Sequence, residues 1–249
     1  MLKNQKILIT GVGKGIGREI FLEALKEGAF VIGVTRSKKD FKEFSHFRGK
    51  YKFFYGDISR QTTIKKIFDY LKKNRIKLTG LVNNAGIRQR KKFEKITKKD
   101  LRKIMENNFE APFSIIQKFC ENCEKKKNCS IVNIGSIVGE KGLSELSGYG
   151  ASKAALNGLT KCLMSEFSQN YKKIRINCLN PGFVKTSFYK KFKKNKKLYN
   201  WTLNKTPLKR WANSNEISNL IEFKTNEQLN QFSRLYFNKV KKNIIFNEL

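Results

Sequence analysis

A tyrosine and a lysine stand four residues apart, at positions 149 and 153, in a segment whose pattern predicts a helix. In a helix this spacing places both side chains on one face, one turn apart. An ammonium group beside a phenol favours the phenolate, so we expect Lys153 to lower the pKa of Tyr149 from its usual value of about 10. A tyrosine tuned in this way can exchange a proton with an alcohol or a carbonyl near neutral pH.

A serine precedes this pair at a position that predicts the end of a strand. Ser136 closes the sequence Ile131-Val132-Asn133-Ile134-Gly135-Ser136. Ligands of parallel sheets bind beyond the carboxyl ends of the strands, so the Ser136 hydroxyl is placed to hydrogen-bond a substrate oxygen. Tyrosine and lysine four residues apart are common on helix surfaces. The serine at a strand end is what favours a proton-transfer site.

Glycines recur between the first predicted strand and the first predicted helix, in Thr10-Gly11-Val12-Gly13-Lys14-Gly15-Ile16-Gly17. They allow a tight turn and a close approach of the backbone to a pyrophosphate. The free N–H groups and the positive dipole end of the helix attract such an anion. Glycines can also serve a turn alone, and it is their place between strand and helix that favours phosphate binding.

The end of the second predicted strand, Gly33-Val34-Thr35-Arg36-Ser37, bears on the choice of dinucleotide. A free ribose 2′-hydroxyl is usually held by an acidic residue near this point, and a 2′-phosphate by a cation. Arg36 supplies a cation and no carboxylate is present, while Lys14 adds a second cation from the glycine turn. These residues favour NADP(H). NAD(H) stays open, because the chain contains 53 Lys and Arg in all.

Short apolar segments alternate with longer amphipathic ones along the chain. Such alternation predicts parallel strands joined by helices, and hence an α/β doubly wound sheet with helices on both faces. The predicted strands are Lys6–Thr10, Phe30–Val34, Tyr51–Tyr55, Gly80–Asn83, Ser130–Ile134 and Ile174–Leu179, and the predicted helices are about Ile16–Lys26, Thr62–Lys73, Lys99–Lys125 and Tyr149–Phe167. No repeat or Pro/Gly-rich linker divides the chain, which predicts a single domain over residues 1–249.

The chain is strongly basic, with 53 Lys and Arg against 20 Asp and Glu and a formal net charge of +33. Such a charge attracts nucleic acid, anionic membranes and phosphorylated substrates. The lysines are nevertheless spread along the whole chain among many Asn, Ile and Phe, a pattern expected from A+T-rich coding DNA. We therefore expect no nucleic-acid partner, and leave open the role of the dense run from Lys190 to Lys197.

Other sequence features bear on location and metals. No segment approaches the roughly 20 apolar residues that a membrane span needs, and the charged N-terminus lacks the pattern of a signal peptide. Both features predict a cytoplasmic protein. Cys120 and Cys123 have a spacing seen in metal sites, but the single histidine, His46, lies far away in sequence. Free thiols are expected, and no metal.

Taken together, the motifs resemble the short-chain dehydrogenase/reductase family over residues 5 to about 223. They occur in the family's order and spacing, and are the glycine turn, Asp57-Ile58, Asn83-Asn84-Ala85-Gly86, Asn107-Asn108-Phe109, Ser136, Tyr149 with Lys153, and Asn180-Pro181-Gly182. The resemblance implies a Rossmann-like fold and a nicotinamide-dependent oxidoreductase that interconverts a carbonyl and a secondary alcohol.

The resemblance also implies roles for individual residues. Asn108 would complete a Ser136–Tyr149–Lys153 catalytic site, holding a water that links Lys153 to solvent. The implied cofactor-binding residues are Gly11, Lys14, Gly15, Ile16, Gly17, Arg36, Asp57, Ile58, Asn84, Ala85, Gly86, Tyr149, Lys153, Pro181, Gly182 and Thr186. Taken singly, Asp57 would be a helix cap, Asn84 a turn residue and Asn108 a surface residue.

The substrate is less well defined by the sequence. Residues of about 183–213 occupy the region that covers the substrate in the family. Their Trp201–Trp211 segment, like Gly86–Arg90, resembles sugar-acid members such as gluconate 5-dehydrogenases. Reductases of 3-oxoacyl groups on a carrier protein share much of the pattern. The nearby lysines would suit an anionic substrate or an acidic carrier protein, so a keto-sugar acid and a 3-oxoacyl thioester both stay open.

The tail of about residues 224–249 departs from the family. It contains no glycine, whereas the family has a Thr-Gly pair before a last strand and Asp-Gly-Gly after it. That strand completes the sheet and supports subunit contacts in the family, so homo-oligomer formation stays open here. The altered tail also raises an alternative function, that of a catalytically impaired member acting as a binding or scaffold protein.

Overall fold

The computed structural model describes residues 2–37, 42–170, 173–186 and 189–219. Its centre is a six-stranded sheet in the order β3-β2-β1-β4-β5-β6, in which each pair of neighbours is parallel. The strands are β1 (Lys6–Thr10), β2 (Phe30–Thr35), β3 (Tyr51–Tyr55), β4 (Gly80–Asn83), β5 (Cys129–Ile134) and β6 (Ile174–Leu179). The predicted doubly wound parallel sheet is confirmed.

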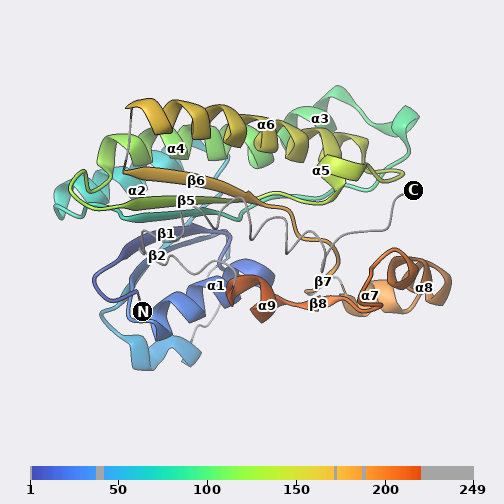
Figure 1. Ribbon diagram of the computed structural model, residues 1–249, viewed down its shortest axis with the longest axis horizontal. Helices are drawn as coiled ribbons and strands as arrows, with labels where there is room; N and C mark the ends of the chain where they lie inside the picture. Colours follow the sequence, from blue (N-terminus) through green and yellow to red (C-terminus); the bar gives the residue numbers. More distant parts are fainter. Residues whose placement is uncertain (1, 38–41, 171–172, 187–188, 220–249) are drawn as a thin grey trace.

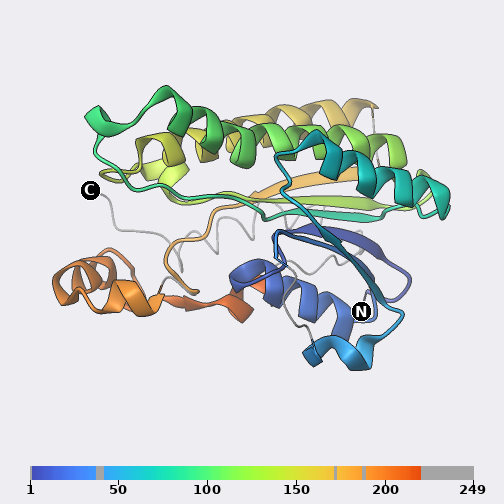
Figure 2. The ribbon, with the colours of Figure 1, turned by 180° about the vertical axis from the view of Figure 1, so that it is seen from behind.

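Helices cover both faces of this sheet (Figure 1). On one face lie α2 (Gln61–Lys73), α3 (Lys98–Met105), α4 (Ala111–Asn122), α5 (Val138–Lys141) and α6 (Ser147–Asn170). Figure 2, the view from behind, shows α2 on the same side as α4 and α6. On the other face lie α1 (Gly15–Lys26) and α9 (Ser214–Asn219), which contact each other, and the 3-10 helix Lys42–Phe47.

The alternation of side chains along β1 shows why helices must pack on both faces of the sheet. Leu8 points into the core beneath α2, α4 and α6, whereas Ile7 and Ile9 point into the core beneath α1. All three side chains are fully buried. Because successive side chains of a strand point to opposite faces, a strand buried on both faces must be apolar throughout.

The strand order fixes where the crevice lies. From β1 the chain moves outward to β2 and β3, and then returns to place β4 on the other side of β1. The connections that leave β1 and β4 therefore diverge at the carboxyl ends of these two strands, which is where open parallel sheets bind their ligands.

The predicted helix Lys99–Lys125 is interrupted in the structure. A capping box of Thr97 and Asp100 starts α3, a π turn follows at Glu106–Glu110, and α4 then ends at Asn122. A π turn adds one residue to a helical turn and is often found at functional sites. A second difference is that α6 begins at Ser147, two residues before the predicted Tyr149.

The predicted substrate-covering segment forms a small lobe beside the carboxyl ends of the strands (Figure 1). Its elements are β7 (Val184–Lys185), α7 (Tyr189–Lys193), α8 (Lys196–Asn204) and β8 (Ala212–Asn213). Trp211 is the lobe's buried centre: its ring stacks on Phe183 with 5.1 Å between centroids, and its Nε1 donates to Thr202 Oγ1 at 2.7 Å. Here the aromatic residues of the segment pack the lobe itself.

Among the described residues, no helix is long and apolar enough to cross a membrane. The described His, Cys, Asp and Glu side chains form no group of three that could hold a metal ion. The atypical tail, residues 224–249, lies outside the described residues.

Candidate functional site

The glycine turn brings β1, α1 and β4 into close contact. Gly11 has a φ of 77°, in the left-handed region that favours glycine, and a Cβ there would lie 2.9 Å from Ala85 Cα. A Cβ on Gly17 would lie 2.4 Å from Gly11 O and 2.2 Å from the Asn84 carboxamide. That carboxamide donates to Thr10 O at 2.9 Å and to Gly11 O at 3.2 Å, which fixes the turn against the end of β4.

A cleft of about 350 Å³ opens at this point between the ends of β1, β2 and β4. It contains eight of the residues expected to bind the cofactor: Gly11, Lys14, Arg36, Asp57, Ile58, Asn84, Ala85 and Gly86. Lys14 is the N-cap of α1, and its side chain makes no capping hydrogen bond. The first N–H groups of a twelve-residue helix thus border a glycine-lined cleft, an arrangement that fits a pyrophosphate.

Several expected cofactor residues lie around the cleft rather than on its wall. Gly17 and Ile16 belong to the first turns of α1, where Gly17 packs against Asn84. The Thr186 side chain lies beside Gly15, since a Cβ on that glycine would be 3.3 Å from Thr186 Cγ2. Pro181 O accepts from Ile137 N at 3.1 Å and ties the segment of Pro181 and Gly182 to the turn after β5.

Two basic residues and one acidic residue, Lys14, Arg36 and Asp57, line this cleft. Lys14 and Arg36 are exposed and Thr35 is buried. Burial tends to raise the pKa of Asp57, but hydrogen bonds from the backbone and side chain of Ser59, helped by the charges of Arg36 and Arg60, hold it below the usual value. Asp57 is therefore an ionised hydrogen-bond acceptor beside the cleft at neutral pH.

The second part of the site joins β5 to α6. Ser136 is buried at the end of β5 and makes a side-chain hydrogen bond with Tyr149, which lies in the first turn of α6. Lys153 follows one turn later, with Nζ 6.0 Å from the centroid of the Tyr149 ring. The structure therefore brings together the three residues expected to form the proton-transfer site.

The charge balance at Tyr149 differs from the expectation. Desolvation raises the pKa of Tyr149 above its usual value, and it outweighs the lowering effects of the Ser136 hydrogen bond and of the Arg88 charge. The reason is burial: a group enclosed by protein favours its neutral form unless opposite charges overcome the cost of desolvation. The charge of Arg88 thus acts on the phenol, an effect that the spacing of Tyr149 and Lys153 did not indicate.

Lys153 is itself enclosed by the protein. Its Nζ donates to Ile134 O at 2.6 Å. Desolvation lowers the pKa of Lys153 to about 8, with a small opposing effect of Cys178. A lysine with a pKa near neutrality can both hold and release a proton, so this residue can take part in proton transfer as well as supply charge.

Asn108 is held in the π turn with its carboxamide pointing inward. Its Oδ1 accepts from Ile87 N at 2.8 Å, and its Nδ2 donates to Ile87 O at 2.9 Å and to Ser152 Oγ at 3.0 Å. A Cβ on Gly86 would lie 3.1 Å from Asn108 Oδ1 and 3.6 Å from Lys153 Nζ. Asn108 therefore lies beside the lysine, as expected, and also clamps the backbone that follows β4.

Further residues line the cleft that the sequence motifs did not assign to cofactor binding, although most of them stand within those motifs. Gly13, Thr35, Ser37, Gly56, Ile87 and Asn107 also line the cleft. Arg88 was read only as part of a segment, without a role at Tyr149. A signal for Arg88 did exist, because it follows β4 by a few residues and side chains there reach the carboxyl edge of the sheet.

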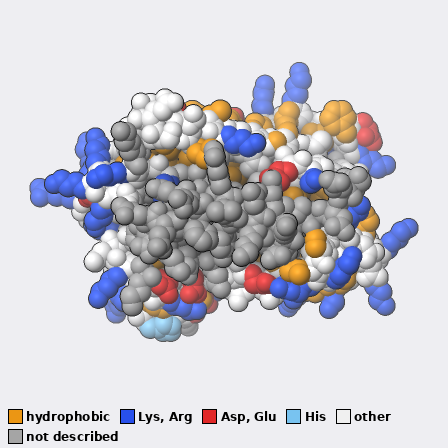
Figure 3. All heavy atoms as spheres, in the orientation of Figure 1, with side chains coloured by type: hydrophobic (Ala, Val, Ile, Leu, Met, Phe, Trp, Pro, Cys, Tyr) orange, Lys and Arg blue, Asp and Glu red, His pale blue; other side chains and the backbone are white. Residues whose placement is uncertain are grey.

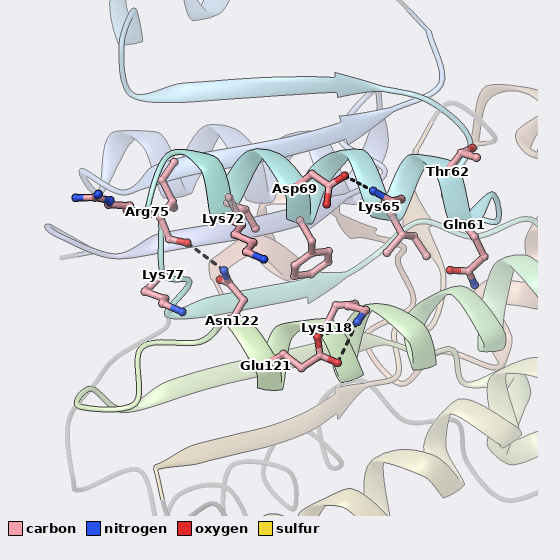
Figure 4. Close-up of a pocket in the computed structure, with 14 residues that line it drawn as sticks. Gln61, Thr62, Lys65, Asp69, Lys72, Arg75, Lys77, Lys118, Glu121 and Asn122 are labelled. Atoms are coloured by element: carbon pink, nitrogen blue, oxygen red, sulfur yellow. Dashed lines mark hydrogen bonds and ion pairs between the residues drawn. The ribbon is translucent and has the colours of Figure 1, made fainter.

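A larger groove, of about 860 Å³, lies between α2 and α4, away from these residues (Figure 4). Its acidic side chains are paired with lysines of the same helix, Lys65 with Asp69 and Lys118 with Glu121, both at the surface. Its lining contains none of the motif residues.

Lys and Arg side chains project around the margin of the face shown in Figure 3. Basic side chains are therefore spread around the described margin of this face rather than gathered in one patch.

The buried amine of Lys153 should make stability depend on pH. Its pKa is about 8 in the folded protein and about 10.5 when unfolded, so between these values the unfolded chain binds more protons and stability rises with pH. Titration of a Lys153→Met variant provides the reference. We expect the free energy of unfolding of the wild type to gain roughly 2 to 3 kcal/mol relative to the variant from pH 8 to pH 10.5. If the free energies of unfolding of the two proteins changed equally with pH across this range, the burial of a titrating amine would be contradicted.

Comparisons with known proteins identify the family of the chain. The family model of short chain dehydrogenases matches residues 5–197. The 3-oxoacyl-[acyl-carrier-protein] reductase of Thermotoga maritima is 29% identical over 231 residues, covering 91% of this chain and 92% of the relative. The 2-dehydro-3-deoxy-D-gluconate 5-dehydrogenase of Bacillus subtilis is 30% identical, covering 89% of this chain and 87% of the relative.

A solved structure shows the same fold. A 4-hydroxyisoleucine dehydrogenase complexed with NADH superposes with a TM-score of 0.84 at 28% identity, and covers 90% of this chain and 92% of its own. The family model matches well over half of the chain. The chain belongs to the short-chain dehydrogenase/reductase family of oxidoreductases.

Proposed function

We propose that the protein interconverts a carbonyl and a secondary alcohol, with Tyr149 as general acid and base and NADP(H) as the preferred cofactor. The observation that carries this proposal is the meeting of Ser136, Tyr149 and Lys153 at the carboxyl end of β5, next to a glycine-lined cleft. Residues 1–249 would act as a single domain, in which the 183–213 lobe covers the substrate.

The side chains divide the proton chemistry among them. Ser136 Oγ hydrogen-bonds the substrate oxygen and Tyr149 Oη gives it a proton in the direction of reduction. The desolvated phenol holds that proton firmly, so nearby cations matter most when charge develops on the phenol oxygen. Lys153, whose pKa is near neutrality, then passes a proton toward Tyr149 along the side of Asn108. The bound nicotinamide supplies or accepts the hydride.

The cofactor would lie along the cleft. Gly11, Gly15 and the start of α1 would bind the pyrophosphate, Asp57 and Ile58 the adenine, and Asn84, Ala85 and Gly86 the nicotinamide ribose. Pro181, Gly182 and Thr186 would hold the nicotinamide amide. The fit rests on the crowding around Gly11 and on the N–H groups of α1, which leave room for phosphate and little for a side chain.

The preference for NADP(H) rests on Lys14 and Arg36, which line the cleft and are exposed. Replacing Arg36 with alanine should raise the KM for NADPH roughly tenfold or more, because a charge-assisted hydrogen bond to a phosphate contributes about 1.5–3 kcal/mol. The KM for NADH should stay within about twofold. Arg60→Ala is the matched control, since Arg60 also acts on Asp57 but does not line the cleft. An equal loss for both cofactors in the Arg36 variant would contradict the preference.

For the substrate we propose a keto-sugar acid or a 3-oxoacyl thioester. Relatives named for each chemistry align along most of the chain. The deciding experiment is NADPH oxidation by the purified protein against a panel of both substrate classes. We expect turnover with at least one class. A protein that binds NADPH but oxidises it with no member of the panel would contradict the proposed reaction.

A further inference from the structure

The loop that leaves β4 is fixed at both of its ends. At the first, both backbone groups of Ile87 are bonded to the Asn108 carboxamide, at 2.8 and 2.9 Å. At the second, Lys91 N donates to Glu145 O at 2.9 Å, just before α6 begins. The residues between Ile87 and Lys91 are therefore held across the entrance between the cofactor cleft and the first turn of α6.

The polar side chains of this loop have different partners. Gln89 Nε2 and Lys91 Nζ both donate to Asp100, each at 2.7 Å, and Arg90 Nε donates to Glu145 at 2.6 Å. These contacts turn three of the four polar side chains toward α3 and toward the segment before α6. Arg88 is the fourth, and it follows the clamped Ile87 directly.

The charge of Arg88 acts on Tyr149. Partial burial lowers the pKa of the Arg88 guanidinium, while the phenol of Tyr149 raises it and Arg90 lowers it further. The reverse effect is also present, since Arg88 favours the phenolate of Tyr149. An arginine stays charged under these conditions, so a fixed positive charge stands beside the proposed proton donor.

We propose that Arg88 binds a carboxylate of the substrate, a few carbon atoms along the chain from the carbonyl that Tyr149 protonates. This inference rests on the proposed function and selects the keto acid between its two substrate classes. A guanidinium offers two parallel N–H donors that match a carboxylate, whereas a 3-oxoacyl thioester has no charge near its reacting carbonyl. Arg88 is thus a residue for substrate specificity. Because its charge acts on Tyr149, it also helps to stabilise the phenolate.

The test uses pairs of substrates that differ in one charge. One pair is 5-keto-D-gluconate and L-sorbose, which has a hydroxymethyl group in place of the carboxylate. The other is 4-oxopentanoate and its methyl ester. The kcat/KM of NADPH oxidation is measured for the wild type, Arg88→Gln, Arg88→Lys and Arg90→Gln. Arg90→Gln is the matched control. It removes an equal charge only two positions further along the loop, from a side chain that is paired with Glu145.

We expect the wild type to prefer the carboxylate member of at least one pair. Arg88→Gln should lower kcat/KM for that member roughly 10- to 100-fold and for the neutral member by less than about threefold. Arg88→Lys should recover part of the loss, and Arg90→Gln should keep the wild-type preference. NADPH binding and thermal melting of each variant show that the fold and the cofactor cleft are intact.

Two results would overturn the inference while leaving the proposed function in place. One is turnover of neutral ketones or 3-oxoacyl thioesters by the wild type with no preference for the carboxylate member. The other is an equal loss for both members of a pair in Arg88→Gln, which would place the effect on Tyr149 or on the loop. By contrast, no turnover with any ketone or thioester by a protein that binds NADPH would overturn the proposed function, and the inference with it.

Discussion

Replacing Tyr149 with phenylalanine should reduce kcat for carbonyl reduction by about 10²- to 10⁴-fold, the range expected when a positioned general acid is lost. The ring remains to fill its place beside Ser136 and Lys153, so only the proton donor is removed. The dissociation constant for NADPH should change by less than about threefold, because the proposed phosphate and adenine contacts lie in the cleft at the ends of β1 and β2. Steady-state kinetics and fluorescence titration of NADPH measure the two quantities.

Tyr70→Phe is the matched control for this experiment. Tyr70 lies in α2, away from the cleft, and its ring packs against Phe54 at a centroid distance of 5.4 Å. The same loss of a hydroxyl there should leave kcat unchanged. A Tyr149→Phe protein with wild-type kcat would show that the proton comes from another group, and Lys153 would then be the nearest candidate.

Replacing Gly17 with alanine should destabilise the protein and weaken NADPH binding together. The new Cβ would lie 2.2 Å from the Asn84 carboxamide and 2.4 Å from Gly11 O, so the backbone of the glycine turn must shift. Overpacking of this kind costs about 3 kcal/mol at the upper end of the usual range. For a domain of this size the melting temperature should fall by roughly 6–12 °C, as measured by differential scanning calorimetry.

Gly158→Ala separates this clash from a general effect of losing a glycine. Gly158 lies within α6 and a Cβ there meets nothing within 4 Å. Alanine favours a helix interior over glycine by about 1 kcal/mol, so this variant should melt at the wild-type temperature or slightly above it. If the two variants melted alike, the close contact of α1 with Asn84 would not be a constraint on the fold.

Much of the fold could be predicted from the sequence because local patterns and the global architecture agree. The apolar strand Lys6–Thr10 and the glycines after it each allow few structures, and together they specify a strand, a turn and a helix. The helix Lys99–Lys125 was predicted without its interruption. A local signal for the interruption does exist, because Pro112 at the start of α4 has no N–H to donate to the carbonyl of Asn108. The bonds of the Asn108 side chain to Ile87 and Ser152 join residues distant in sequence and could not be predicted from a local pattern.

The candidate site likewise has features that local sequence patterns predict and features that they do not. The pairing of Tyr149 with Ser136 and Lys153 follows from helix spacing and from the position of strand ends, both of which are local properties. The pKa of Tyr149 and the place of Arg88 depend on how much solvent the folded chain excludes and on contacts made by Asn108, Asp100 and Glu145. The spacing of residues in the sequence cannot predict the pKa of Tyr149 or the position of Arg88, because both depend on how several loops pack together.

The most direct test of the central claim follows the hydride and the proton in one reaction. The protein is incubated with a ketone substrate found in the panel and with NADPH carrying deuterium at the transferred position of C4. We expect a secondary alcohol with one deuterium on its carbinol carbon, formed by the wild type and by Tyr70→Phe at similar rates and by Tyr149→Phe at a rate at least about 100-fold lower. Formation of the deuterated alcohol at the wild-type rate by Tyr149→Phe, or oxidation of the cofactor without any alcohol, would contradict it.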